Sequence, residues 1–149
     1  MSVELRESGF DPWQALLDYQ QSRPALNGTS GASFGATSVF VGTMRDFNEG
    51  DTVSAMRLEH YPAMTRKHLE AICAEAAQRW DIVDSLIIHR YGDIRPHDPI
   101  VLVAVWSAHR AESFPACRYL IEELKSRAPF WKQETTDDST RWVEHNTPG

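Results

Sequence analysis

The sequence has 149 residues, 42% of them hydrophobic and 24% charged, which is typical of one globular domain. Its net charge of −6 argues against a nucleic-acid-binding face, so an anionic ligand would need a local basic pocket. The start of the chain lacks the apolar stretch of a secretion signal, and no run approaches the ~20 apolar residues that span a bilayer. We therefore expect a cytoplasmic protein without a membrane segment.

The first part of the chain predicts a helix, a loop and a β-hairpin. Residues 11–21 place apolar side chains at helical spacing, and the Gly-, Ser- and Pro-rich residues 22–35 predict a loop. The β-branched run 36–42 predicts a strand. Residues 53–61 alternate well enough to form the second arm of a hairpin, with the turn supplied by residues 45–51.

The rest of the chain predicts two amphipathic helices and three strands. Apolar residues at three- to five-residue steps predict a helix from Pro62 to Trp80. Residues 82–92 and 100–108 predict strands, and the second is apolar on both faces, as in a central strand. The next helix is indicated by Phe114, Cys117, Ile121 and Leu124, with Pro115 in its first turn and its end before Pro129. Residues 141–144 predict a short final strand. Strands in adjacent pairs favour an α+β fold in a single domain.

Metal and redox chemistry have little support in the sequence. The two cysteines, Cys73 and Cys117, lie far apart in helix-like surroundings, so we expect buried free thiols in a reducing compartment. The six histidines are scattered, without the spacing of a metal site. No nucleophile motif is present, and we expect neither a metal nor a cofactor.

Cationic residues, in contrast, stand at the ends of predicted elements. The chain has three lysines, and two of them, Lys125 and Lys132, flank a Pro-Phe-Trp step. Arg45 follows the strand that ends at Gly42, and the His-Arg pairs 89–90 and 109–110 each close an apolar strand. Each has an ordinary explanation by itself: a lysine in the last turn of a helix interacts well with the helix dipole.

If these ends converge, they form a pocket for a phosphate or carboxylate, with Phe130 and Trp131 as an apolar wall. A lysine held near other cations in such a pocket would have a lowered pKa and could exchange protons near neutrality.

Several separate motifs, in order, resemble one enzyme family. The segments FVGTMRDFNEGDTV, LEHYPAM, IIHRYG, SAHRAESFPAC and LKSRAPFWKQE are similar to the large catalytic subunit of molybdopterin synthase, over residues 34–144. The resemblance implies sulfur transfer from the C-terminal thiocarboxylate of a small ubiquitin-like subunit to a cyclic pyranopterin monophosphate, precursor Z. The attacking sulfur would belong to the partner, which accounts for the missing nucleophile.

The resemblance also implies roles for particular residues and an assembly. It places catalysis on Lys125 and Lys132, and substrate binding on Thr43, Met44, Arg45, His109, Arg110, Gln133 and Glu134. It implies the α/β hammerhead fold of that subunit, and a homodimer within a heterotetramer whose His-Arg pair reaches the other protomer's pocket. The chain would divide into an N-terminal helix and flexible loop (1–33), a catalytic domain (34–144) and a frayed end (145–149).

Two positions depart from the family pattern. Pro115 stands where relatives often have Glu, and Thr43 where some have Lys, although neither change touches the two lysines. Other hypotheses stay open: a module that binds a ubiquitin-like tail without chemistry, or an enzyme acting on another small phosphate ester.

Overall fold

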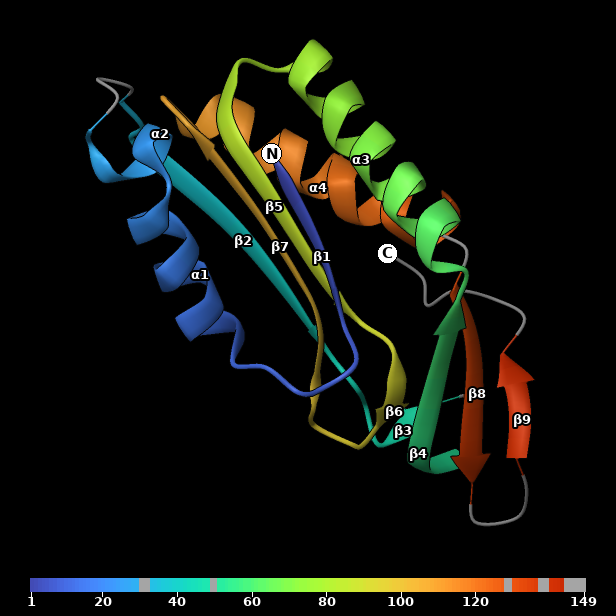
Figure 1. Cartoon of the computed structure of the whole chain (residues 1–149). Helices are drawn as coiled ribbons and strands as arrows, with labels where there is room; N and C mark the ends of the chain where they lie inside the picture. The colour runs from blue at the N-terminus through green and yellow to red at the C-terminus, as the bar shows by residue number, and fades with distance from the viewer. Residues whose placement is uncertain (30–32, 49–50, 128–129, 137–139, 144–149) are drawn as a thin grey trace.

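Two β-sheets organise the chain (Figure 1). The computed structural model describes residues 1–29, 33–48, 51–127, 130–136 and 140–143. The elements, in chain order, are β1 (Ser2–Arg6), α1 (Pro12–Ser22), α2 (Pro24–Asn27), β2 (Ala36–Thr43), β3 (Phe47–Asn48), β4 (Asp51–His60), α3 (Pro62–Arg79), β5 (Ile82–Arg90), β6 (Gly92–Ile94), β7 (Pro99–Ser107), α4 (Arg110–Arg127), β8 (Phe130–Thr136) and β9 (Thr140–Val143).

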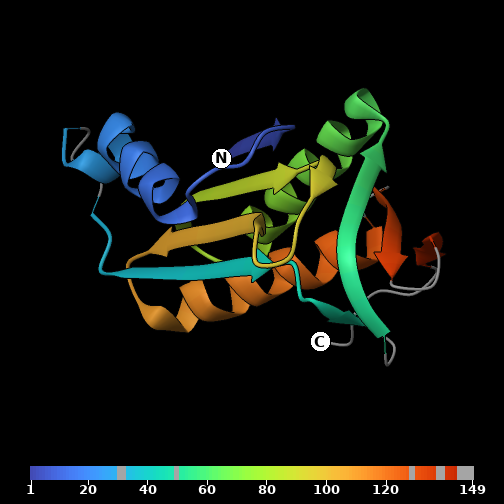
Figure 2. The same cartoon turned by 90° about the horizontal axis from the view of Figure 1, so that it is seen from below.

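The first sheet is built around β7. Its described strands follow the order β1-β5-β7-β2, with β1 parallel to β5 and the other neighbours antiparallel. Alternate side chains of β7 enter two different clusters, because successive residues of a strand point to opposite faces. One cluster packs against α3 and α4 and the other against α1 and α2, so helices cover both faces (Figures 1 and 2). The prediction of a central strand here is confirmed.

The two long helices bury their apolar sides as the spacing predicts, with exceptions at the predicted ends. Leu69, Ile72 and Ala76 of α3 are fully buried, whereas Met64 is exposed. Helix α4 begins at Arg110, so the prediction that Pro115 lies in its first turn is wrong. Phe114, which the prediction placed on the apolar side, is 65% exposed, and the proline costs one backbone bond inside the helix.

The predicted hairpin between residues 36–42 and 53–61 is also wrong. Strand β2 pairs with β7 instead, while β4 belongs to a second sheet with the order β3-β4-β8-β9, in which β6 also pairs with β4. Just beyond β2, the backbone of Met44 is bonded to the loop before β7: its N–H donates to the Asp98 carbonyl, and its carbonyl accepts from the His97 N–H. Pairing with β7 lets the partly buried side chains of Val39 and Val41 pack in the core.

Four strands, β1, β3, β6 and β8, were absent from the predicted order, and the short helix α2 lies in the predicted loop 22–35. β8 continues directly from the Pro-Phe-Trp step and pairs with β4 over His60↔Phe130 to Val53↔Thr136. β1 gives the N-terminal region a place at the edge of the first sheet, beside β5. The expected final strand is present as β9, whereas residue 144 and the expected frayed end lie outside the described residues.

The α+β class is confirmed by these mixed sheets and their helices. In the part of the chain that the structure describes, none of the helices combines the length and apolar character needed to cross a bilayer.

Candidate functional site

Lys125 and Lys132 face one small cavity at the junction of the two sheets. Its volume is about 40 Å³, little more than one water molecule occupies in the liquid. Five elements contribute to its lining, which consists of Leu58 (β4), His89 (β5), Ile100 (β7), Leu124 and Lys125 (α4), and Phe130 and Lys132 (β8). The described lining is therefore apolar except for two lysines and one histidine.

Lys125 comes from the last turn of α4, where the buried Leu124 anchors the helix on the core. Burial, together with the nearby charges of Lys132 and Arg45, lowers the pKa of its ammonium group to about 8, while Glu122 opposes them. A lysine with this pKa is mostly protonated at neutral pH and can still exchange a proton.

Lys132 comes from β8, where it lies opposite Leu58 of β4. Alternation along the strand puts Phe130, Lys132 and Glu134 on the same face. Burial lowers the pKa of Lys132, with Glu134 raising it and Arg45 lowering it. The two lysines thus share both the cavity and a third cation, Arg45.

Arg45 follows the end of β2, where Thr43 is exposed and Met44 is buried against the second sheet. The backbone of Met44 is tied to the β6–β7 loop through Asp98 and His97. Asp98 in turn accepts a hydrogen bond from Arg90, at 3.1 Å between Nη1 and Oδ2. Arg45 itself is exposed, and its charge reaches both lysines.

The side chains of Gln133 and Glu134, the two residues after Lys132, point to opposite faces, since successive residues of a strand alternate in direction. Gln133 is partly buried and pairs in register with Arg57 and Trp142. Glu134 is 6% exposed, and its Oε2 lies 3.4 Å from Nη2 of Arg141.

His109 and Arg110 lie away from this cavity. Both are exposed at the start of α4, whereas Lys125 lies 15 residues further, roughly 22 Å along the axis at 1.5 Å per residue. Within one chain, the structure therefore brings together Arg45, Lys125 and Lys132 but not the His-Arg pair.

His89 is not the cation that its position at a strand end suggests. The sequence groups it with the cationic strand ends, but burial, together with the charges of Lys125, Lys132 and His60, lowers its pKa to about 3, against the opposing effect of its hydrogen bond to the Arg90 carbonyl. It is therefore neutral at physiological pH. Its place in the cavity could not be found by alternation, because β5 is buried on both faces at this end. Phe130, an expected wall residue, stacks on its ring; the side chain of Trp131 lies outside the described part.

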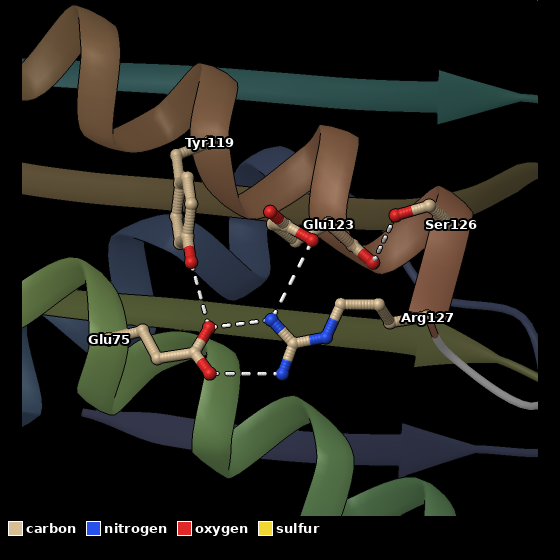
Figure 3. Close-up of polar contacts among 5 residues, drawn as sticks. All are labelled: Glu75, Tyr119, Glu123, Ser126 and Arg127. Carbon is tan, nitrogen blue, oxygen red and sulfur yellow. Dashed lines mark hydrogen bonds and ion pairs between the residues drawn. The ribbon is translucent and has the colours of Figure 1, made fainter.

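A second charged cluster holds the end of α4 against α3 (Figure 3). Arg127 donates two hydrogen bonds to Glu75, at 2.6 and 3.0 Å, and Tyr119 donates one at 2.7 Å. Glu123 lies 3.6 Å from Arg127 on the same helix. These contacts fix the turn that carries Lys125 and from which the chain continues towards β8.

The cysteines behave as predicted. Cys73 and Cys117 are buried free thiols, and burial raises the pKa of each to about 11. Among the residues that the structure describes, no group of three or more His, Cys, Asp or Glu could hold a metal ion.

Fold and site together define an α+β protein with a small cationic pocket for an anionic group. Residues 14–127 match the family model described as MoaE protein, and the chain belongs to this family. The match begins before residue 34, where the resemblance of motifs begins, so it includes most of α1.

Individual relatives agree with this membership. The chain is 47% identical over 143 residues to a molybdopterin synthase catalytic subunit from Ralstonia nicotianae, covering 96% of this chain and 77% of the relative. The structure is similar to a molybdopterin biosynthesis MoaE protein from Burkholderia ambifaria, with a TM-score of 0.78 and 40% identity, covering 99% of this chain and 92% of that one. Molybdopterin synthase from Staphylococcus aureus gives a TM-score of 0.80 at 29% identity, with 95% and 96% covered.

Proposed function

We propose that this chain is the catalytic subunit of a molybdopterin synthase. It would transfer sulfur from the C-terminal thiocarboxylate of a small ubiquitin-like subunit to a cyclic pyranopterin monophosphate, forming the dithiolene. The observation that carries the proposal is the convergence of Lys125 and Lys132 on one cavity, in a chain of net charge −6, with the charge of Arg45 near enough to lower the pKa of both lysines. Both anionic reactants would be attracted there.

Sulfur transfer here would need no nucleophile from this chain. The thiocarboxylate sulfur attacks a carbon of the pterin side chain and displaces the oxygen bonded to it, which takes up a proton and leaves as water. A second water then hydrolyses the acyl–sulfur bond, leaving a thiol on the pterin and a carboxylate on the tail. A second tail delivers the second sulfur. Protonated Lys125 stabilises the negative charge that develops and supplies a proton, and Lys132 positions the tail.

Substrate binding would fall to residues around the mouth of the cavity. Arg45 holds the phosphate or pterin, beside Thr43 and Met44, with Gln133 and Glu134 on the β8 side. The catalytic residues lie within 34–144, while the described residues before them supply the edge strand β1 and the helices α1 and α2 that pack on the first sheet. We place the protein in the cytoplasm, in keeping with its two buried thiols.

His109 and Arg110 would act across a homodimer, in the cavity of the other protomer. Their distance from Lys125 on the same helix supports this arrangement. The surface beside them offers apolar contact area: Phe114 is 65% exposed, and Ser113 next to it accepts a hydrogen bond from Ser38 of the edge strand β2. Exposed Phe40 lies on that same strand. Each dimer would bind a small subunit at either end.

The function is tested by a single-turnover assay. The purified chain is mixed with thiocarboxylated small subunit and cyclic pyranopterin monophosphate, and dithiolene is followed by mass spectrometry. Product is expected. A folded chain that binds the small subunit but makes none would favour the module that binds a tail without chemistry.

The dimer is tested by mixing two inactive variants, Arg110→Ala and Lys125→Ala. After subunit exchange, half of the dimers are mixed and each has one intact site, so about a quarter of wild-type activity should return. A mixture as inactive as its components, with mixed dimers verified by mass spectrometry, would refute action across the dimer.

A further inference from the structure

His89 is a fixed residue of the cavity wall. Its side chain is buried, with the residue 5% exposed, and its ring stacks on Phe130 with centroids 3.9 Å apart and planes inclined by 16°. Its Nδ1 lies 2.7 Å from the carbonyl oxygen of Arg90. A carbonyl only accepts hydrogen bonds, so Nδ1 carries the proton and Nε2 of the neutral ring keeps a lone pair.

The surroundings of His89 explain why the ring stays neutral. The charged or titratable groups that face it are Lys125 from α4, Lys132 from β8 and His60 from β4. All three are cationic when protonated, and a further positive charge beside them would be repelled in a buried position. The ring is therefore a neutral element within a cationic pocket.

Among the described residues that line the cavity, His89 alone has a side chain able to accept a hydrogen bond while the lysines are protonated. The others are either apolar or ammonium groups that only donate. Nε2 of His89 makes no hydrogen bond to any described residue. An entering ligand that offers an N–H beside its anionic group can therefore satisfy the histidine and the lysines together.

We propose that Nε2 of His89 accepts a hydrogen bond from the last peptide N–H of the partner's C-terminal tail. In an extended C-terminal residue, this N–H is separated from the terminal acyl carbon by one Cα, so anion and donor arrive as one unit. The ammonium groups of Lys125 and Lys132 would bind the anionic end while His89 accepts from the N–H, since all three side chains line the same cavity. His89 thus distinguishes a terminal peptide from other small anions. This inference rests on the proposed function.

Two matched variants separate the acceptor from the packing of the ring. His89→Asn keeps an N–H near the position of Nδ1 but has no atom at Nε2, whereas His89→Gln can place an amide oxygen near Nε2. Both lose the stacking on Phe130 equally. Thermal unfolding of each establishes that it is folded before binding is measured.

The binding probe is semisynthetic small subunit whose last linkage is either the natural amide or an ester, which lacks the N–H. We expect His89→Asn to weaken binding of the amide form about 5- to 10-fold, the usual scale for one hydrogen bond, and His89→Gln to recover most of it. The ester should weaken binding to the wild type by a similar factor and bind the Asn variant no more weakly than the amide does.

Equal binding of amide and ester forms by the wild-type chain would overturn the inference while leaving the proposed function intact. So would a loss of pyranopterin binding in His89→Asn with tail binding unchanged, which would assign the acceptor to the pterin. Wild-type chain that binds neither form of the small subunit would overturn the proposed function and this inference together.

Discussion

Lys125 and Arg127 lie two residues apart in the last turn of α4, yet their surroundings are opposite. Arg127 faces Glu75, Glu123 and Tyr119, and its hydrogen bonds to Glu75 raise its pKa (Figure 3). Lys125 is partly buried and lies near two further cations, Lys132 and Arg45, so its pKa falls to about 8. The same turn of helix therefore carries Arg127, which lies beside carboxylates, and Lys125, which lies near other cations.

The difference separates a structural role from a chemical one. A cation beside carboxylates stabilises the fold, whereas a cation that is desolvated among like charges destabilises it and becomes easier to deprotonate. Strongly perturbed groups in a cavity are candidates for chemistry for this reason. The charged cluster of Arg127, Glu75, Glu123 and Tyr119, which we call the clamp, also holds this turn in place while Lys125 is repelled by its neighbours.

The largest expected effect is on turnover, and it should differ between variants of Lys125 and of Arg127. Lys125→Ala should fold normally and lose ~100-fold or more in single-turnover rate, the scale of a removed acid–base or charge-stabilising group. Arg127→Ala serves as the matched control, a truncated cation of the same turn, and should keep most of its activity. Comparable losses in both variants would mean that Lys125 acts only through the stability of the turn.

The next effect is on the pH dependence of the rate. If protonated Lys125 is required, the single-turnover rate should be level below pH 8 and fall above it, with a midpoint near the pKa of about 8. Glu122 raises this pKa and Arg45 lowers it, so Glu122→Gln should move the midpoint down and Arg45→Gln should move it up. Two shifts in the same direction, or none, would assign the alkaline limb to another group.

A smaller effect is expected on the free energy of unfolding, which should rise when the buried charge of Lys125 is removed. The pKa of Lys125 falls from 10.5 to about 8 on folding, so below pH 8 the folded state carries the full cost of its charge. Lys125→Met should therefore be more stable than the wild type at pH 7, by on the order of 2 kcal/mol. The gap should close between pH 8 and 10.5, where the unfolded wild type holds more protons. Denaturant unfolding at these pH values measures it, and a less stable Met variant at pH 7 would contradict it.

The sequence contains enough information for the elements with strong patterns. β7 is apolar on both faces and could be placed centrally, and the buried residues of α3 follow its spacing. The pairing of β2 with β7 could not be deduced, because it depends on residues far along the chain: Met44, just after β2, is hydrogen-bonded to His97 and Asp98, 53 and 54 residues away. β8 was missed because its residues, Phe-Trp-Lys-Gln-Glu-Thr-Thr, form a strand by pairing with β4 and β9, and no local pattern indicates these partners.

The site was also predictable only in part, because some of its residues stand out in the sequence and others acquire their character from distant residues. Lys125 and Lys132 stand out because lysine is rare in this chain, and both line the cavity. His89 could not be distinguished from other strand-end cations, because its neutrality arises from burial and from lysines 36 and 43 residues away along the chain.

The smallest expected effect is on the melting temperature, when a carboxylate of the clamp around Arg127 is removed. Hydrogen bonds from Arg127 and then Tyr119 lower the pKa of Glu75 from 4.5 to about 2, so its contribution to stability is present above pH 4.5 and is lost as the pH falls through 2. Glu75→Gln should melt a few degrees below the wild type near pH 6, and the two melting curves should converge towards pH 2. Glu123→Gln, the matched control, removes only the 3.6 Å contact within α4 and should shift melting less. Because the clamp is exposed and acts on Lys125 only by holding its turn, Glu75→Gln should reduce turnover far less than Lys125→Ala does. A melting difference that persists unchanged to pH 2 would mean that Glu75 acts through packing instead of charge.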